Sequence, residues 1–229
     1  MMDHARDLAS VRDATDRLLT AVAALDNAAV TDQSRLPGWT RGHVLVHLAR
    51  NADALVNVLE GRPMYVSAEV RDADIERGAA RPLAAQLADV RESAARFQAT
   101  GDTPADWSRT VELRNGVTDS ASRVPFRRWA EVELHHVDLG IGYELEDLSA
   151  EFTERETDFL AARFTGHEDV PPTELRAEDG RTWTTGGGAE GATVAVEGTA
   201  ADLLGWLAGR REGFGLTVKG GTLPSLPPL

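Results

Sequence analysis

Residues 127–140, RRWAEVELHHVDLG, place two adjacent histidines close to acidic side chains in what reads as one helix. Residues four apart on an α-helix lie about 40° apart around its axis, one turn above each other. Glu131 and His135 have this spacing, and Asp138 falls near the same side. His136 points about 100° further round. The spacing therefore offers Glu131 and His135 as a pair of metal ligands and turns His136 away from them.

A second pair of histidines, His43 and His47, lies on an earlier predicted helix. The apolar side chains of that helix define its buried stripe: Val44, Leu48, Ala52, Leu55 and Leu59. His43 lies nearly opposite the centre of the stripe, whereas His47 is rotated about 40° towards it. His47 is therefore nearer the boundary between core and solvent, where a side chain that points between helices would lie. The pattern favours His47 as a third ligand without excluding His43.

Two histidines and a glutamate are suitable ligands for zinc or another divalent metal. Three protein ligands would also leave coordination positions open for chemistry. The alternative interpretation is structural, because a Glu-x-x-x-His pair on a helix surface stabilises that helix by roughly 0.2–0.5 kcal/mol without any metal. Asp138 either orients one of the ligands or stabilises the local fold, and we favour the second role.

The chain has no cysteine, which excludes disulfides, cysteine metal ligands and a catalytic protein thiol. Thiol chemistry would need a thiol from outside the protein, and a metal with open positions could bind such a thiol and lower its pKa. A dianionic substrate would in addition need arginines. Arg210 and Arg211 end the last predicted helix, where the helix dipole alone favours basic residues. The functional interpretation is that one of them reaches into a cleft between domains.

Helical spacing predicts the elements that must position these side chains, at 7–25, 40–60, 81–101 and 125–141. Thr40 is a suitable N-cap for the second helix, Gly61 a suitable stop, and Pro125 lies in the first turn of the fourth. Four such helices predict an up-and-down bundle. The stretch 61–78 reads as a long loop, and loops of that length in compact domains are often functional.

The pattern changes after about residue 166, where a small α+β domain is expected. A fifth helix is predicted at 152–164, before this change. The predicted elements of the small domain are two short strands about an Asp179-Gly180 turn, a further turn at 186–191, a strand at 192–198, a short helix capped by Thr199 and a last strand at 215–221. We therefore expect an α+β protein with a helical bundle over 1–165 and a small α+β domain over 166–229.

The composition limits the class of protein. Hydrophobic residues make up 42% and charged residues 27%, as in a soluble globular protein. The formal net charge of −13 argues against nucleic acids and anionic membranes as partners, because both need basic patches. No apolar run approaches the roughly 18 residues of a membrane span, and the first residues do not read as a secretory signal. We expect a cytoplasmic, monomeric protein that acts on a small molecule.

Several segments carry a family resemblance. They are GWTRGHVLVHLARNADAL at 38–55, PMYVSAEVRDADI at 63–75, AEVELHHVDLG at 130–140, VEGTAADLLGWLAGR at 196–210 and the proline-rich end. Together they resemble the mycothiol-dependent maleylpyruvate isomerases over nearly the whole chain, although Ala130 stands where that family can have arginine. The match at 63–75 is the most specific, because no general helix physics would produce Pro-Met-Tyr-Val-Ser.

The resemblance implies a fold and a site. The fold is a DinB-like four-helix bundle joined to a small α+β domain like those of sterol-carrier proteins. The site is a zinc centre held by His47, Glu131 and His135, which leaves the other two histidines of these helices outside it. The family's functional arginine corresponds to Arg210 rather than Arg211.

The implied reaction is the cis–trans isomerisation of maleylpyruvate to fumarylpyruvate in gentisate breakdown, a pathway of aromatic catabolism. Zinc would activate the mycothiol sulfur, and Arg210 would hold a substrate carboxylate or the enolate. Three other functions fit the same residues: a mycothiol S-transferase that conjugates electrophiles, a metal-dependent hydrolase, and a non-catalytic module that binds metal and a lipid or regulatory partner. The loop at 63–75 favours the isomerase over the transferase, and open coordination positions argue against a purely structural zinc.

Overall fold

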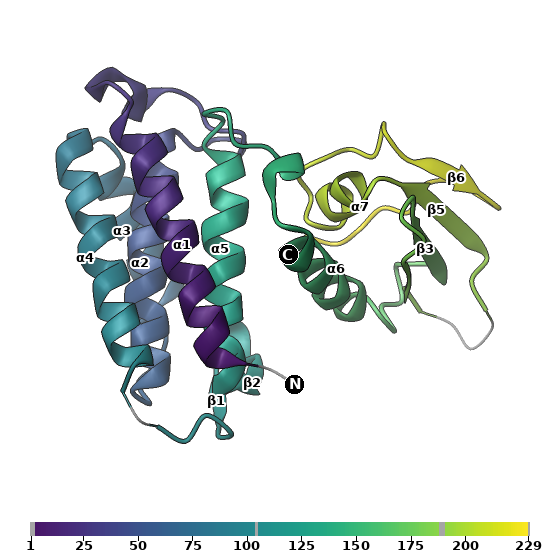
Figure 1. Cartoon of the computed structure of the whole chain (residues 1–229), viewed down its shortest axis with the longest axis horizontal. Coiled ribbons are helices and arrows are strands. Elements are labelled where there is room, and N and C mark those ends of the chain that lie inside the picture. The colour runs from purple at the N-terminus through teal and green to yellow at the C-terminus, as the bar shows by residue number, and fades with distance from the viewer. Residues whose placement is uncertain (1–2, 104, 188–190, 229) are drawn as a thin grey trace. The chain divides into compact units, whose positions relative to one another are not determined.

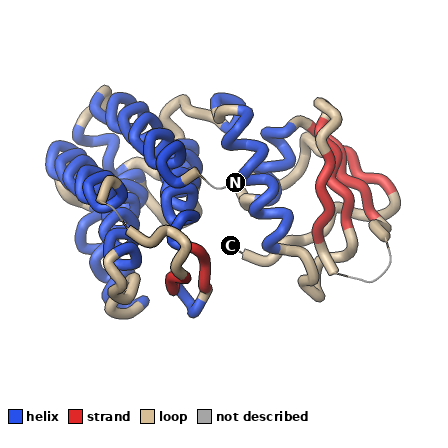
Figure 2. The backbone as a smooth tube through the Cα atoms, turned by 60° about the horizontal axis from the view of Figure 1, so that its bottom comes forward, coloured by secondary structure: helices blue, strands red, loops and turns tan. Residues whose placement is uncertain are grey.

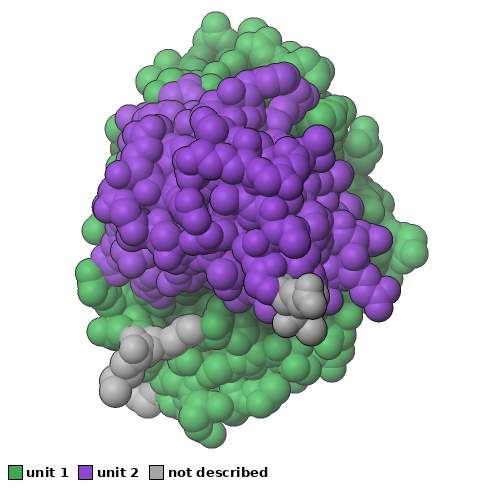
Figure 3. All heavy atoms as spheres, turned by 90° about the vertical axis from the view of Figure 1, so that its right-hand side faces the viewer, with its two compact units in different colours: residues 1–143 green, residues 144–229 purple. Residues whose placement is uncertain are grey.

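The structure is a computed structural model, and it describes residues 3–103, 105–187 and 191–228. The chain divides into two compact units, Met1–Tyr143 and Glu144–Leu229 (Figure 3). The first is helical and the second is a small sheet with helices, so the expected α+β fold is confirmed. The division falls one helix earlier than the boundary expected after residue 165.

The N-terminal unit contains a four-helix bundle with one additional helix (Figure 1). The helices are α1 (His4–Ala23), α2 (Arg41–Leu59), α3 (Ala68–Ala79), α4 (Leu83–Gly101) and α5 (Val124–Asp138). Helices α1 and α2 each pack against both α4 and α5. The core between them is formed by buried apolar side chains, among them Leu18, Val22, Leu48, Leu55, Phe97 and Val132. All four predicted helices of the bundle are therefore present.

Local signals account for where the helices begin. The Asp3 side chain accepts a hydrogen bond from the Arg6 backbone N–H (3.1 Å) at the start of α1. Thr40 precedes α2 as predicted, and the side chain of His43 completes a capping box with it. Pro125 lies in the first turn of α5, where its missing N–H costs nothing. The capping box at Thr40 and the proline in the first turn of α5 account for where these two ligand-bearing helices begin.

The prediction of a loop at 61–78 is wrong, because α3 occupies most of it. The Ser67 side chain caps this helix by accepting a hydrogen bond from the Val70 backbone N–H (3.2 Å). Only Ile75, Gly78 and Ala79 of α3 are buried, so the helix has no apolar stripe for a periodicity search to detect.

Helix α3 also changes the bundle topology. Two ion pairs join α2 to α4: Arg50 pairs with Asp89, and Asp53 pairs with Arg96. The later residue of α2 pairs with the later residue of α4, so the two helices run in the same direction. The long helices therefore do not alternate as an up-and-down bundle would, because α3 returns the chain to the end where α2 began.

A short hairpin links α4 to α5 and was not predicted. Its strands are β1 (Thr110–Glu112) and β2 (Thr118–Ser120), which pair antiparallel. Asn115 and Gly116 turn the chain with φ values of 60° and 72°. An Asn-Gly pair is a strong hairpin signal, and it was the feature that could have located this hairpin.

The C-terminal unit is a four-stranded sheet with two helices on one face (Figure 2). Its elements are α6 (Ala150–Arg163), β3 (Thr173–Ala177), β4 (Thr182–Thr185), β5 (Val194–Gly198), α7 (Ala200–Leu207) and β6 (Thr217–Lys219). The strand order is β4-β3-β5-β6, with β3 and β5 parallel and the other pairs antiparallel. Helix α6 groups with this unit because it packs against α7 and β4.

The predicted helices and strands of this unit are present, and Thr199 caps α7 by accepting a hydrogen bond from the Asp202 backbone N–H (3.1 Å). The turn expected at 186–191 lies partly outside the described residues. Short 3-10 helices complete the chain, at Asn27–Thr31, Arg114–Gly116, Ala121–Arg123 and Leu145–Asp147. In the part of the chain that the structure describes, no helix combines the length and the apolar character needed to cross a membrane.

Candidate metal centre

The candidate ligands come from two neighbouring helices of the bundle, His47 from α2 and Glu131 and His135 from α5. Arg128 ties these helices together, because its Nη1 donates to the Leu48 carbonyl (2.9 Å) and to Asn51 Oδ1 (2.8 Å). Its side chain is among the largest that are fully buried. Arg128 lies one turn before Glu131, so it fixes how closely the two ligand-bearing turns approach each other.

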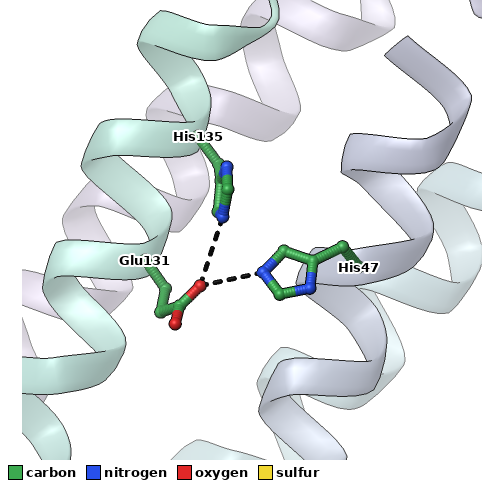
Figure 4. Close-up of side chains that lie close together, drawn as sticks. All are labelled: His47, Glu131 and His135. Carbon is green, nitrogen blue, oxygen red and sulfur yellow. Dashed lines mark hydrogen bonds and ion pairs between the residues drawn. The ribbon is translucent and has the colours of Figure 1, made fainter. Parts of the chain in front are cut away.

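The three side chains converge on one carboxylate oxygen (Figure 4). Glu131 Oε2 lies 2.9 Å from His47 Nε2 and 3.3 Å from His135 Nε2. One ligand atom from each residue lies within 4.8 Å of the others. The two histidines are buried, whereas the Glu131 side chain is 33% exposed. Among the described residues this is the one group of three histidine or acidic side chains with such spacing.

Asp138 orients His135, contrary to the role that we favoured from the sequence. His135 Nδ1 donates to Asp138 Oδ2 at 2.8 Å, and the Asp138 side chain is fully buried. A carboxylate at Nδ1 holds a proton on that nitrogen, so the proton that His135 would give up to bind a metal is the one on Nε2, which faces Glu131. Ligand histidines in metalloproteins commonly have such a partner.

The electrostatics favour an ionised carboxylate between two histidines. Burial opposes the ionisation of Glu131, but its hydrogen bonds with His135 and His47 outweigh burial and hold its pKa well below the ordinary value. Burial also opposes charge on His135, yet Asp138 and Glu131 raise its pKa. Burial and the nearby His135 lower the pKa of His47, so this ring is neutral at neutral pH. An anionic carboxylate and imidazole lone pairs form a donor set that fits a divalent cation.

The other histidines of these helices have structural contacts. His43 Nδ1 accepts a hydrogen bond from the Thr40 backbone N–H (3.1 Å), and its Nε2 lies 3.2 Å from Glu76. The ring of His136 stacks on Tyr143 with centroids 4.1 Å apart. Helical geometry therefore separated His135 from His136 correctly, and the contacts of His43 explain its absence from the group.

Arg210 lies in the C-terminal unit beyond the end of α7, which stops at Leu207, so neither Arg210 nor Arg211 ends this helix as expected. Its side chain is half-buried, and its Nη1 donates to the carbonyl of Ala208 at 2.6 Å. Arg211 instead forms ion pairs with Asp202 and Glu146, both at 2.6 Å, which stabilise that unit. A catalytic role for Arg210 stays a prediction.

Two residues of the segment read as a loop were not identified as site residues. Arg71 Nη2 lies 3.2 Å from Nδ1 of His47, and Tyr65 lies beside Arg71. The sequence signal was the unusual Pro-Met-Tyr-Val-Ser run, which pointed to the segment but not to which of its side chains reach the ligands.

The fold and the site together define a class, an α+β protein whose helical bundle holds a candidate divalent-metal centre. Comparison with known proteins identifies the family. Residues 11–140 match the mycothiol maleylpyruvate isomerase N-terminal domain, and residues 147–228 match the C-terminal domain of the same family. The chain therefore belongs to the mycothiol maleylpyruvate isomerase family, which confirms the resemblance seen in the sequence.

Solved structures agree with this assignment. A crystal structure of the mycothiol-dependent maleylpyruvate isomerase is 28% identical to the chain, with a TM-score of 0.89. A histidine-to-alanine mutant of that enzyme is 27% identical, with the same TM-score. Each match covers 99% of this chain and 97% of the other. No curated protein sequence matches the chain.

Proposed function

We propose that this protein is an enzyme that isomerises the cis double bond of maleylpyruvate to give fumarylpyruvate, with mycothiol as a required thiol. The observation that carries the proposal is the match of both family domains across the chain, in a structure whose bundle holds a His-Glu-His group. Monomeric state, cytoplasmic location and a place in gentisate breakdown stay predictions.

The chemistry explains why a thiol is needed. A carbon–carbon double bond conjugated to carbonyls does not rotate freely. Addition of a thiolate at one of its carbons makes the bond single and moves an electron pair towards the adjacent carbonyl oxygen. After rotation, return of that pair re-forms the double bond in the trans arrangement and expels the thiolate unchanged. No atom is gained or lost, and the chain itself has no cysteine to supply the sulfur.

We propose that His47, Glu131 and His135 hold a zinc ion. Zinc bound there would lower the pKa of a coordinating thiol, which supplies thiolate at neutral pH. The residues of the chain prepare the site for this. Asp138 keeps the proton of His135 on Nδ1, and the depressed pKa of Glu131 keeps that carboxylate anionic. Burial of both rings restricts them to one orientation, so little conformational entropy is lost on binding.

We propose that Arg210 binds a substrate carboxylate or the negative charge that develops on the substrate oxygen. The ion pairs of Arg211 with Asp202 and Glu146 give that neighbour a structural role, which supports choosing Arg210. Replacing Arg210 by alanine should abolish turnover and leave zinc affinity unchanged. Arg163→Ala removes an exposed arginine from the same unit and serves as the control. Unchanged turnover in Arg210→Ala would refute this role.

The test of the function is an absorbance assay of the zinc-loaded protein with maleylpyruvate, with and without mycothiol. We expect conversion to fumarylpyruvate only when mycothiol is present. Isomerisation that ignores mycothiol would overturn the mechanism. No isomerisation, together with conjugation of a model electrophile to mycothiol, would make the protein a mycothiol S-transferase instead.

A further inference from the structure

Arg71 is a cation beside the candidate ligands that the proposed mechanism has not used. It lies on α3, and its side chain is only 12% exposed. Its Nη2 lies 3.2 Å from His47 Nδ1, and its Nη1 donates to Asp72 Oδ1 at 2.6 Å. The guanidinium carbon lies 5.8 Å from the centre of the Tyr65 ring. A half-buried arginine is thus held one imidazole ring away from the convergence point of the ligands.

The hydrogen bond between Arg71 and His47 is incompatible with a metal ion bound to Nε2 of His47. A guanidinium group can only donate hydrogen bonds, so Nδ1 of His47 must accept here and its proton must lie on Nε2, towards Glu131. A neutral imidazole that binds a metal through Nε2 carries its proton on Nδ1. Two donors would then face each other, and Arg71 must give up this hydrogen bond. Its Nη2 becomes available to another acceptor while Asp72 still holds Nη1.

The surrounding charges specify the kind of acceptor. Burial raises the pKa of Tyr65, Glu131 raises it further, and Arg71 and Arg114 oppose them, so these groups share one environment. The charge of Arg128 also interacts with the carboxylate of Glu131. Glu131, Asp138 and the Asp72 partner of Arg71 contribute three negative charges, and Arg71 and Arg128 contribute two positive ones. A divalent cation would therefore give the site an excess of positive charge, although the chain carries −13 overall.

The N-terminal unit also has room for a ligand next to Tyr65. A cavity of about 530 Å³ lies between residues 61–68 and the β1–β2 hairpin, and Tyr65 and Arg114 are among its lining residues. Pockets for small ligands are of this size. Tyr65 is shared between this cavity and Arg71, because the Arg71 guanidinium carbon lies 5.8 Å from the centre of the Tyr65 ring.

We propose that Arg71 binds a carboxylate of the substrate beside the metal, with Tyr65 as the adjoining wall of the site. The inference rests on the proposed function in one respect, because it takes the substrate to be a dianion. It assigns a substrate-binding residue to the helical unit. This residue lies on α3, in the stretch that the sequence pattern predicted as a loop. Arginine suits the task, because its guanidinium stays charged and can donate from Nη2 to a carboxylate while Nη1 remains on Asp72.

The test compares Arg71→Ala and Arg71→Lys with a matched control, Arg77→Ala. Arg77 lies on the same helix, is 74% exposed and pairs with Asp74 at 3.1 Å. The first readout is the affinity of the zinc-loaded, thiol-free protein for maleate, a simple dicarboxylate, measured by calorimetry. The second is zinc affinity, measured by competition with a chromophoric chelator. The third is the separation of KM and kcat for maleylpyruvate.

We expect Arg71→Ala to bind maleate about 10- to 100-fold more weakly and to raise KM by a similar factor, which is the range for one charge-assisted hydrogen bond. Its kcat should fall far less than its kcat/KM. Arg71→Lys should recover part of the loss, because lysine keeps the charge but not the fork. Arg77→Ala and the zinc affinity of all variants should match the wild type.

Unchanged maleate affinity and KM in Arg71→Ala would overturn the inference. A loss of zinc affinity without a loss of maleate affinity would also overturn it, since Arg71 would then serve only to orient His47. The proposed function fails in a different way. If the wild type does not isomerise maleylpyruvate, the maleate and zinc measurements still decide whether Arg71 binds a carboxylate.

Discussion

Replacing Asp138 by asparagine tests how the ligand group is organised. In the wild type, Asp138 Oδ2 accepts the Nδ1 proton of His135 at 2.8 Å in a fully buried environment. Asparagine has nearly the same shape, but its amide can donate to Nδ1 instead of accepting from it. Donation moves the imidazole proton to Nε2 and blocks the lone pair that should face the metal. The substitution thus changes the tautomer of His135 while the packing is kept.

The size of the effect follows from this geometry. Loss of a hydrogen-bonding partner behind a metal-ligating histidine costs about 10- to 100-fold in metal affinity, equivalent to about 1.4–2.8 kcal/mol. We expect the upper part of this range, because the pair is buried and solvent cannot replace the carboxylate. Zinc affinity would be measured by chelator competition. Asp16→Asn, an exposed site on α1, removes the same charge and is the control. Equal zinc affinity in Asp138→Asn and Asp16→Asn would refute the reasoning.

The same substitution has a pH-dependent effect on the metal-free protein. Burial lowers the pKa of His135, but Asp138 and Glu131 outweigh burial and raise it. A histidine with a raised folded-state pKa contributes stability below its ordinary pKa, and that contribution is lost as pH rises through the folded-state value. Asp138→Asn should therefore destabilise the metal-free protein most in mildly acidic solution, in denaturation experiments across pH. A stability difference that grows with pH would contradict this sign.

Other predictions concern single positions of the bundle. His135→Gln should lose zinc affinity and His136→Gln should keep it, in the same chelator competition; the reverse result would exclude the proposed ligand set. Arg128→Ala should lower the free energy of unfolding by about 3 kcal/mol in urea titrations, because buried acceptors on α2 lose their donor; a change under 1 kcal/mol would show that Arg128 does not tie the helices. Gly42→Ala should lower the free energy of unfolding by about 1–3 kcal/mol in the same titration, since the new Cβ would lie 2.0 Å from the Ala79 carbonyl oxygen. An unchanged midpoint would contradict this close packing of α2 and α3.

The sequence determined the features that depend on local geometry. The 3.6-residue period of a helix alone paired Glu131 with His135 and separated His136 from them. Caps such as Thr40 and Thr199 located helix starts, since an N-cap satisfies backbone donors of its own first turn. The lack of cysteine required that any thiol come from outside the chain. Each of these inferences depends only on residues within about one helical turn of each other, or on the number of cysteines in the chain.

The tertiary structure decided which separate elements meet. Helical spacing left both His43 and His47 open, and only the packing of α2 against α5 brings His47 to within 2.9 Å of Glu131. The burial of Asp138 decided its role, because its hydrogen bond is formed inside a core that the sequence does not display. Arg71 reaches His47 because α3 runs back along α2, and α3 has too few buried residues to leave a period. These groups meet through packing between elements that are far apart in the sequence, and a local sequence pattern does not predict such packing.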